Sequence, residues 1–227
     1  MTLLITTALP VIGVTIKSIE NENLLPLRNG YIDQEQTTYC GYGMILSPPY
    51  LNAQSFKPTI ETLTHIELWL YKNGNPPSGI EITASIREEI NGTDLASKTI
   101  NADDVGIGQG TWVSFNFEDI TVIPEETYYI ICYANGGGTM GNCYTWLFDI
   151  GDKYPRGEAW HSDDSGATWI TLWEWFEYSP EWEEPDLCFK TYWKQSKEKT
   201  FNKPFLNWLQ SHPNMFPVLQ KLLQITL

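Results

Sequence analysis

The stretch from Thr171 to Pro185 (TLWEWFEYSPEWEEP) combines aromatic rings and carboxylates at high density. Aromatic faces that stack on sugar C–H groups, beside carboxylates that accept hydrogen bonds from hydroxyls, are typical of sugar recognition. A long loop or exposed hairpin is expected here, in which burying every ring is difficult. The sequence therefore predicts a ligand-binding platform, and the alternative is that its rings cap the open end of a β-sandwich. The candidate ligand-binding residues are Trp160, Trp173, Trp175, Tyr178 and Trp182.

Carboxylates in the same region could instead hold Ca²⁺. Their spacing is unlike that of an EF-hand loop, so no cofactor is expected, Ca²⁺ is kept as an alternative, and the metal site is undetermined. The carboxylates concerned are Glu174, Glu177, Glu181, Glu183, Glu184 and Asp186.

No set of residues indicates catalysis. The three histidines, His65, His161 and His212, belong to no recognisable Ser/Cys–His–acid arrangement, and the chain has no nucleophile elbow or phosphate loop. We therefore expect a protein that is not an enzyme. A carboxylate pair for glycoside cleavage is the remaining catalytic alternative, because any acidic loop offers such pairs.

The segment Ser162–Trp169 (SDDSGATW) fits the Asp-box pattern Ser-x-Asp-x-Gly-x-Thr-Trp at every defined position. Asp164 can accept hydrogen bonds from turn amides, Gly166 permits a positive φ, and Trp169 can pack under the hairpin. The segment resembles the Asp boxes of sialidases and other β-propellers, where the motif is repeated, whereas it occurs here once. The resemblance implies a structural hairpin and no sialidase activity, since the only arginines, at positions 28, 87 and 156, offer no catalytic set.

The charge balance restricts the partners. The 227 residues include 14 Lys and Arg against 28 Asp and Glu, which gives a net charge of −14. Such a field repels phosphate backbones and anionic lipids, so nucleic acid is not expected as a partner. It fits a surface protein with a neutral ligand such as sugar, and it equally fits a role in solubility alone.

Four cysteines are spread along the chain without a CxxC or Cys/His cluster, so a zinc site is not expected. In an exported protein the even count predicts two disulfides. Cys132 with Cys188 is the preferred pair because both lie in strand-like runs, which leaves Cys40 with Cys143. The alternative is four buried thiols.

The elements that must position these residues are strands. Apolar and polar residues alternate with period two in His65–Tyr71, Gly79–Arg87 and Thr111–Phe117, which indicates antiparallel sheets with one buried face. Turn-forming clusters separate many short strands, and no helical stretch precedes Lys194. The prediction is an all-β fold, an antiparallel, jelly-roll-like β-sandwich. The remaining expected strands are Thr127–Ala134, Cys143–Ile150, Gly157–His161, Thr168–Leu172 and Leu187–Trp193.

The two ends differ from the middle. Residues 1–14 are uncharged and mostly apolar, which fits either the remnant of a signal peptide or an apolar first strand. Residues 15–193 are expected to form one β-sandwich domain. Residues 194–203 are predicted to be a polar, basic linker, and residues 204–227 a short apolar helical tail. This tail could bind a protein partner or fold back on the sandwich edge.

Several segments resemble a jelly-roll-like extracellular module of exported and surface proteins, especially those of archaea. They are Ala53–Thr59 (AQSFKPT), Leu63–Leu68 (LTHIEL), Thr127–Cys132 (TYYIIC), Tyr154–Trp160 (YPRGEAW) and Asp186–Tyr192 (DLCFKTY). The resemblance implies an extracellular module attached to varied partners and brings no catalytic residues. The prediction is thus a secreted or cell-surface binding module for carbohydrate or another cell-surface polymer. The alternative is a structural or adhesion protein that assembles through its C-terminal tail.

Overall fold

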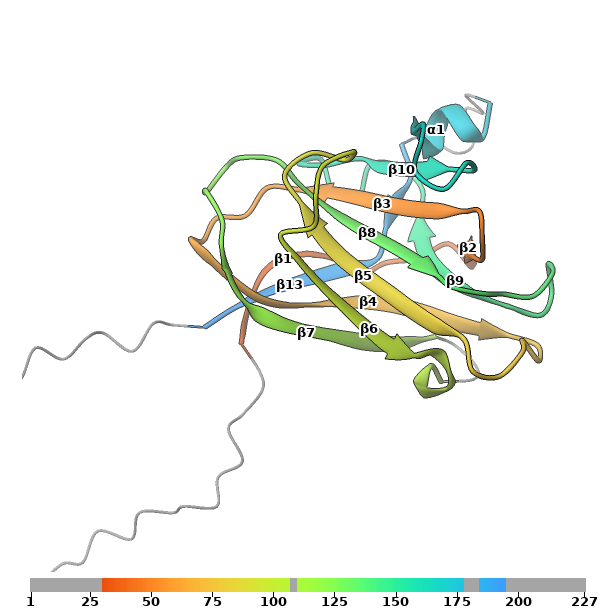
Figure 1. The fold of residues 1–227 in the computed structure, drawn as a ribbon. Coiled ribbons are helices and arrows are strands. Elements are labelled where there is room, and N and C mark those ends of the chain that lie inside the picture. Colours follow the sequence, from red (N-terminus) through yellow and green to blue (C-terminus); the bar gives the residue numbers. More distant parts are fainter. Residues whose placement is uncertain (1–29, 107–109, 178–183, 195–227) are drawn as a thin grey trace, which may run out of the picture.

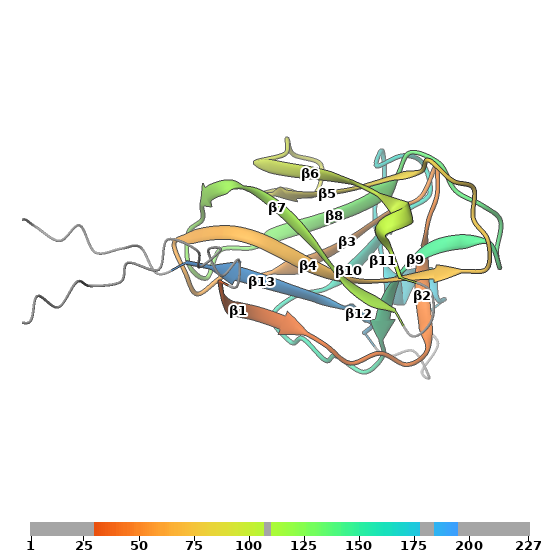
Figure 2. The ribbon, with the colours of Figure 1, turned by 90° about the horizontal axis from the view of Figure 1, so that it is seen from below.

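The predicted antiparallel β-sandwich is confirmed. A computed structural model describes residues 30–106, 110–177 and 184–194, and these residues form two facing sheets of seven and six strands (Figures 1 and 2). The seven-stranded sheet has the order β1-β13-β4-β9-β12, with β2 beside β9 and β7 beside β4. The six-stranded sheet has the order β11-β10-β3-β8-β5-β6.

The strands of the seven-stranded sheet are β1 (Tyr31–Gln36), β2 (Tyr42–Leu46), β4 (Thr62–Asn73), β7 (Thr111–Thr121), β9 (Cys143–Asp149), β12 (Asp186–Leu187) and β13 (Phe189–Trp193). Those of the six-stranded sheet are β3 (Leu51–Phe56), β5 (Glu81–Arg87), β6 (Ala96–Asn101), β8 (Tyr128–Ala134), β10 (Ala159–Ser162) and β11 (Ile170–Thr171). Two single helical turns, the 3-10 helix η1 (Ala102–Asp104) and α1 (Leu172–Trp175), accompany them.

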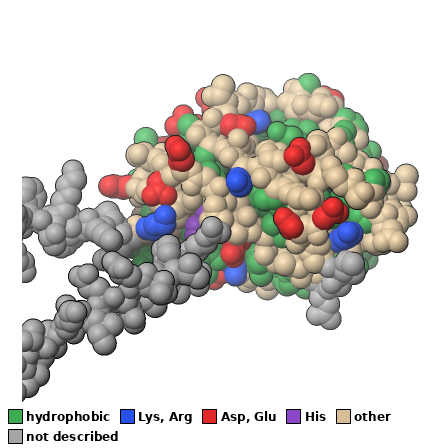
Figure 3. Space-filling view, turned by 60° about the horizontal axis from the view of Figure 1, so that its bottom comes forward, with side chains coloured by type: hydrophobic (Ala, Val, Ile, Leu, Met, Phe, Trp, Pro, Cys, Tyr) green, Lys and Arg blue, Asp and Glu red, His purple; other side chains and the backbone are tan. Residues whose placement is uncertain are grey.

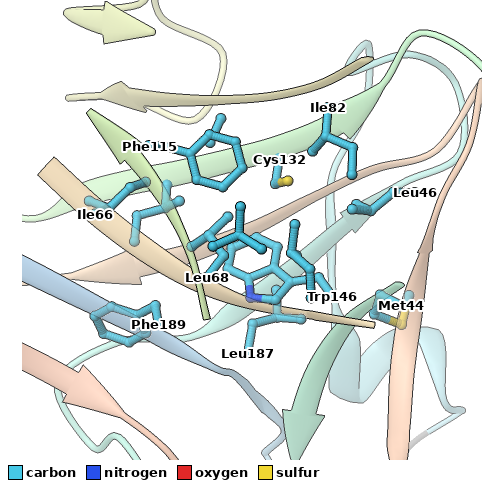
Figure 4. Packing of buried hydrophobic residues seen from close by; sticks show 14 of the residues in the cluster. Met44, Leu46, Ile66, Leu68, Ile82, Phe115, Cys132, Trp146, Leu187 and Phe189 are labelled. Atoms are coloured by element: carbon cyan, nitrogen blue, oxygen red, sulfur yellow. The ribbon is translucent and has the colours of Figure 1, made fainter. Parts of the chain in front are cut away.

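The core lies between the two sheets (Figure 4). Ile66 and Leu68 of β4 point into it from the seven-stranded sheet, and Ile82 of β5 and Cys132 of β8 meet them from the six-stranded sheet. Trp146 of β9 is completely buried among them. The period-two pattern of the sequence therefore arises, as predicted, because one face of each sheet packs against the other sheet.

A buried polar group also links the two sheets. Asp186 of β12, only 2% exposed, accepts hydrogen bonds from Gln54 Nε2 of β3 (3.0 Å) and from the backbone N–H of Tyr154 (2.8 Å). The backbone N–H of Leu187 donates to Gln54 Oε1 (2.7 Å), so both ends of the Gln54 amide are used. Burial nevertheless raises the pKa of Asp186 to about 7, because removal from water disfavours the ionised form.

The predicted disulfides are absent, and that prediction is corrected. All four cysteines are free thiols. Cys132 packs in the core between the sheets, whereas the Cys188 thiol donates to the carbonyl of Thr38 (3.0 Å) and the Cys40 thiol to that of Phe148 (3.4 Å). Three of the four thiols are buried, as the alternative expected, and Cys40 is partly exposed. The cysteines therefore give no support to the expectation of export.

Titration of the denatured, unreduced protein with a thiol reagent should therefore find four reactive thiols. Burial raises the pKa of the Cys132 and Cys188 thiols, which keeps them protonated and slow to oxidise in the native state. The same titration before denaturation should find few. Fewer than four thiols after denaturation would restore the disulfide prediction.

The two ends of the sandwich differ in what they carry. β1 begins beside the end of β13, with Tyr31 paired to Trp193, so the described chain enters and leaves the sandwich at one end. The turn α1 and strand β2 lie at the other end (Figures 1 and 2). The predicted signal remnant (1–14), most of the linker (194–203) and the helical tail (204–227) lie outside the described residues. Within the described ranges, no helix is long and apolar enough to cross a membrane.

Candidate functional site

A tight hairpin between β10 and β11 fixes one side of the site. Asp164 accepts hydrogen bonds from the backbone N–H of Thr168 (2.9 Å) and from the Ser162 hydroxyl (2.8 Å). Gly166, at φ +87°, donates its N–H to the same hydroxyl (2.9 Å). The bonds from Thr168 and Ser162 lower the pKa of Asp164 to about 2. An ionised Asp164 therefore holds this turn closed at neutral pH.

After β11 the chain forms the helical turn α1, where a loop or hairpin was expected. Thr171 caps it, because the N–H of Glu174 donates to Thr171 Oγ1 (3.1 Å) and Glu174 Oε2 accepts from the N–H of Thr171 (3.0 Å). This reciprocal pair is a capping box. Leu172 is completely buried, and the next two tryptophans, Trp173 and Trp175, stay 37% and 38% exposed.

Trp175 forms one wall of an aromatic groove of about 290 Å³ at this end of the sandwich. Its ring centroid lies 4.3 Å from that of His161, and the Tyr50 ring lies 5.5 Å from the same imidazole. The groove is lined by Tyr42, Gly43, Met44, Ile45, Tyr50, Met140, Phe148, His161, Trp175 and Phe176. Mostly apolar walls with a few fixed polar groups are typical of sites that bind small neutral molecules.

His161 supplies one polar group of the groove. Successive strand residues point to opposite faces, and His161 of β10 faces inward, where it is only 3% exposed. Its Nδ1 lies 2.8 Å from Oδ1 of Asn52, its cross-strand neighbour on β3. Its Nε2 is buried and has no hydrogen-bond partner within the described residues. Burial lowers the pKa of His161 to about 4, so the ring is neutral at pH 7.

No protein-family model and no curated protein matches this chain.

The structure does not bring the predicted platform residues together. Trp175 lines the aromatic groove, whereas Trp160, next to His161 on β10, faces the other side of the sheet and lines a separate hollow with Tyr129 and Arg156. Trp173 lines a third, acidic hollow of about 150 Å³ beside Asp186. Tyr178 and Trp182 lie outside the described residues. The three rings that can be placed therefore line three separate hollows.

The Ca²⁺ alternative gains no support from the placed carboxylates. Asp186 is in the interior with both carboxylate oxygens engaged, and Glu174 caps α1. In the part of the chain that the structure describes, no group of three or more His, Cys, Asp or Glu is placed to hold a metal ion. Glu181 and Glu183 lie outside that part.

The residues that complete the groove were not predicted from the sequence. Tyr42 and Tyr50 come from segments more than 100 residues before Trp175, and His161 was considered only as one of three histidines without a catalytic arrangement. One local signal was available: His161 follows Trp160 in a strand, so the two must face opposite sides of the sheet.

Proposed function

We propose that this chain is an extracellular, non-catalytic binding module whose ligand is a carbohydrate or another neutral cell-surface polymer, bound at the aromatic groove. The observation that carries the proposal is a partly exposed tryptophan, Trp175, in a concave site beside Tyr50 and the inward-facing His161. Aromatic rings pack against the C–H faces of a sugar, and a fixed polar group orients its hydroxyls.

The charge of the protein supports a neutral ligand. The chain carries a net charge of −14, and on the face shown in Figure 3 acidic side chains are scattered among apolar and polar ones. A negative field of this kind repels anionic polymers and does not hinder a neutral one. The proposed surface location is supported by the apolar N-terminal run and by the resemblance to exported modules described above.

Trp175→Ala should weaken ligand binding about five- to tenfold, since one stacked ring contributes on the order of 1 kcal/mol. The matched control is Trp173→Ala, because Trp173 belongs to the same turn and is equally exposed but lines a different hollow. The full-length protein is screened on a glycan array, and the best glycan is then titrated by calorimetry against both variants. Equal loss in both variants, or no loss in Trp175→Ala, would contradict binding at the groove.

A further inference from the structure

The unpaired nitrogen of His161 requires an explanation. Nearly all buried polar atoms in folded proteins have a hydrogen-bond partner, and an orphaned one costs stability. His161 lines the aromatic groove, and its Nε2 is buried and without a partner among the residues that the structure describes. An unpaired acceptor on a side chain that lines a concave site is suited to a group that arrives with a ligand.

The neighbours of His161 decide which group that is. Asn52 Nδ2 donates to the carbonyl of Ile45 (3.1 Å), which orients the amide so that its Oδ1 faces His161. Since Oδ1 can only accept, His161 Nδ1 must carry the proton. Nε2 is then an acceptor with a free lone pair. The low pKa of His161, which burial causes and nearby Asp163 opposes, keeps a second proton off the ring at pH 7.

We infer that His161 determines specificity in the groove: its Nε2 accepts a hydrogen bond from a ligand hydroxyl, so the site takes a neutral ring that carries an O–H group. The location of the ligand rests on the proposed function, and the inference adds the chemistry that selects it. A ligand ring without a hydrogen-bond donor would leave Nε2 buried and unpaired. A ligand group that can only accept a hydrogen bond would be repelled by the lone pair of Nε2.

The size of the groove limits the ligand to a small unit. Its volume of about 290 Å³ is at the lower end of small-molecule sites, which span roughly 300–1,000 Å³. This volume accommodates one six-membered ring, whose hydroxyl would be directed at His161. For a sugar polymer, the groove would hold a single sugar unit.

The tautomer is tested first, without any ligand. Long-range proton–nitrogen NMR on the full-length protein at pH 7 should show that the proton of His161 resides on Nδ1 and that Nε2 is unprotonated. A proton on Nε2, or a doubly protonated ring, would overturn the inference, because the groove would then present a donor.

The selectivity is tested with phenol and anisole, which share a ring and differ in that anisole lacks the O–H donor. The wild-type protein should bind phenol about tenfold more tightly than anisole, the effect of one net hydrogen bond, measured by NMR titration. His161→Asn should remove this preference, because its short amide can still reach Asn52 but offers nothing at the Nε2 position. The control His65→Asn changes a histidine on β4, outside this groove, and should keep the preference.

Equal affinities for phenol and anisole in the wild-type protein would overturn the inference even if a variant failed to fold. A titration with methyl glycosides separates this result from the proposed function. One outcome is that glycosides bind, that Trp175→Ala abolishes this binding, and that phenol and anisole bind with equal affinity. This outcome would leave the proposed function standing and contradict the role of His161. A phenol preference that His161→Asn abolishes, without glycoside binding, would support the role of His161 and contradict the carbohydrate ligand.

Discussion

Between pH 4 and pH 8 the wild-type protein is expected to lose about 4 kcal/mol of unfolding free energy through the titration of Asp186. Replacing Asp186 by Asn is expected to remove this loss. In the folded protein the pKa of Asp186 is raised from 3.8 to about 7, mainly by burial. Each unit of pKa shift corresponds to about 1.4 kcal/mol. Between pH 4 and 7 the unfolded chain releases this proton while the folded chain keeps it, so the wild-type protein loses stability as the pH rises.

An asparagine in place of Asp186 cannot titrate, so this loss should disappear in the variant. Its amide nitrogen cannot accept a hydrogen bond, whereas the two oxygens of Asp186 accept from both Gln54 Nε2 and the Tyr154 N–H. The variant therefore carries a constant cost of about 1–3 kcal/mol for the donor that is left unpaired. The slope of stability against pH, and not its value at one pH, is the quantity to compare.

His161 makes the comparison sharper because its slope has the opposite sign. Its pKa is lowered from 6.5 to about 4, so between pH 6.5 and 4 the unfolded chain binds a proton that the folded chain refuses, and stability falls with acidification. In the wild-type protein the two slopes oppose each other over this interval. In Asp186→Asn the slope due to His161 should emerge as a rise of stability with pH.

Urea unfolding followed by tryptophan fluorescence at half-unit steps from pH 4 to 8 measures these slopes. Glu118→Gln is the control, because Glu118 is an exposed carboxylate on β7 and should give a curve parallel to that of the wild type. Parallel curves for Asp186→Asn and the wild type would show that Asp186 does not carry the raised pKa.

Trp146→Ala is expected to destabilise the domain by about 3–5 kcal/mol, the cost of emptying a buried aromatic site. Trp146 is completely buried between the sheets, and its Nε1 donates to the carbonyl of Cys188 (2.7 Å), which also accepts from the backbone N–H of Trp69 (3.3 Å), so the change removes one of the two hydrogen bonds to this carbonyl (Figure 4). The melting temperature should fall by about 6–20 °C, at roughly 2–4 °C per kcal/mol for a chain of this size.

Trp175→Ala should lower the unfolding free energy clearly less than Trp146→Ala, because the Trp175 residue is 38% exposed and lines an open groove. Differential scanning calorimetry of the two variants side by side makes the comparison. An equal loss of stability would mean that Trp175 is a core ring, and the proposed binding role of the groove would have to be dropped.

Strand β4 was predicted because its inward positions are apolar: Ile66, Leu68 and Leu70 are completely buried. Strands β1, β2, β3 and β6 were not assigned. In β3 the inward positions hold Asn52 and Gln54, whose partners His161 and Asp186 lie more than 100 residues away. A period-two search for apolar residues cannot detect a strand whose buried face is polar. The turn α1 was detectable, because Thr171 and Glu174 have the spacing of a capping box.

For the candidate site, the sequence selected one residue that lines the proposed groove, Trp175. Selecting residues by aromatic type found Trp175 but also took Trp160 and Trp173, which line other hollows. Composition does not contain the direction in which a side chain points. That direction follows from strand alternation at β10 and from the helical turn at residues 172–175. Tyr42 and Tyr50 join Trp175 in the groove only when the chain is folded.

The neighbouring positions of Tyr31 and Trp193 have a consequence for how the aromatic groove is presented to a ligand. The first and last strands of the described chain, β1 and β13, begin and end respectively at the end of the sandwich opposite α1 and β2 (Figure 1). If the sandwich is attached to a larger structure at this end, the groove lies at the end away from the attachment. A ligand on a neighbouring surface would then reach Trp175 and His161 without passing the tether.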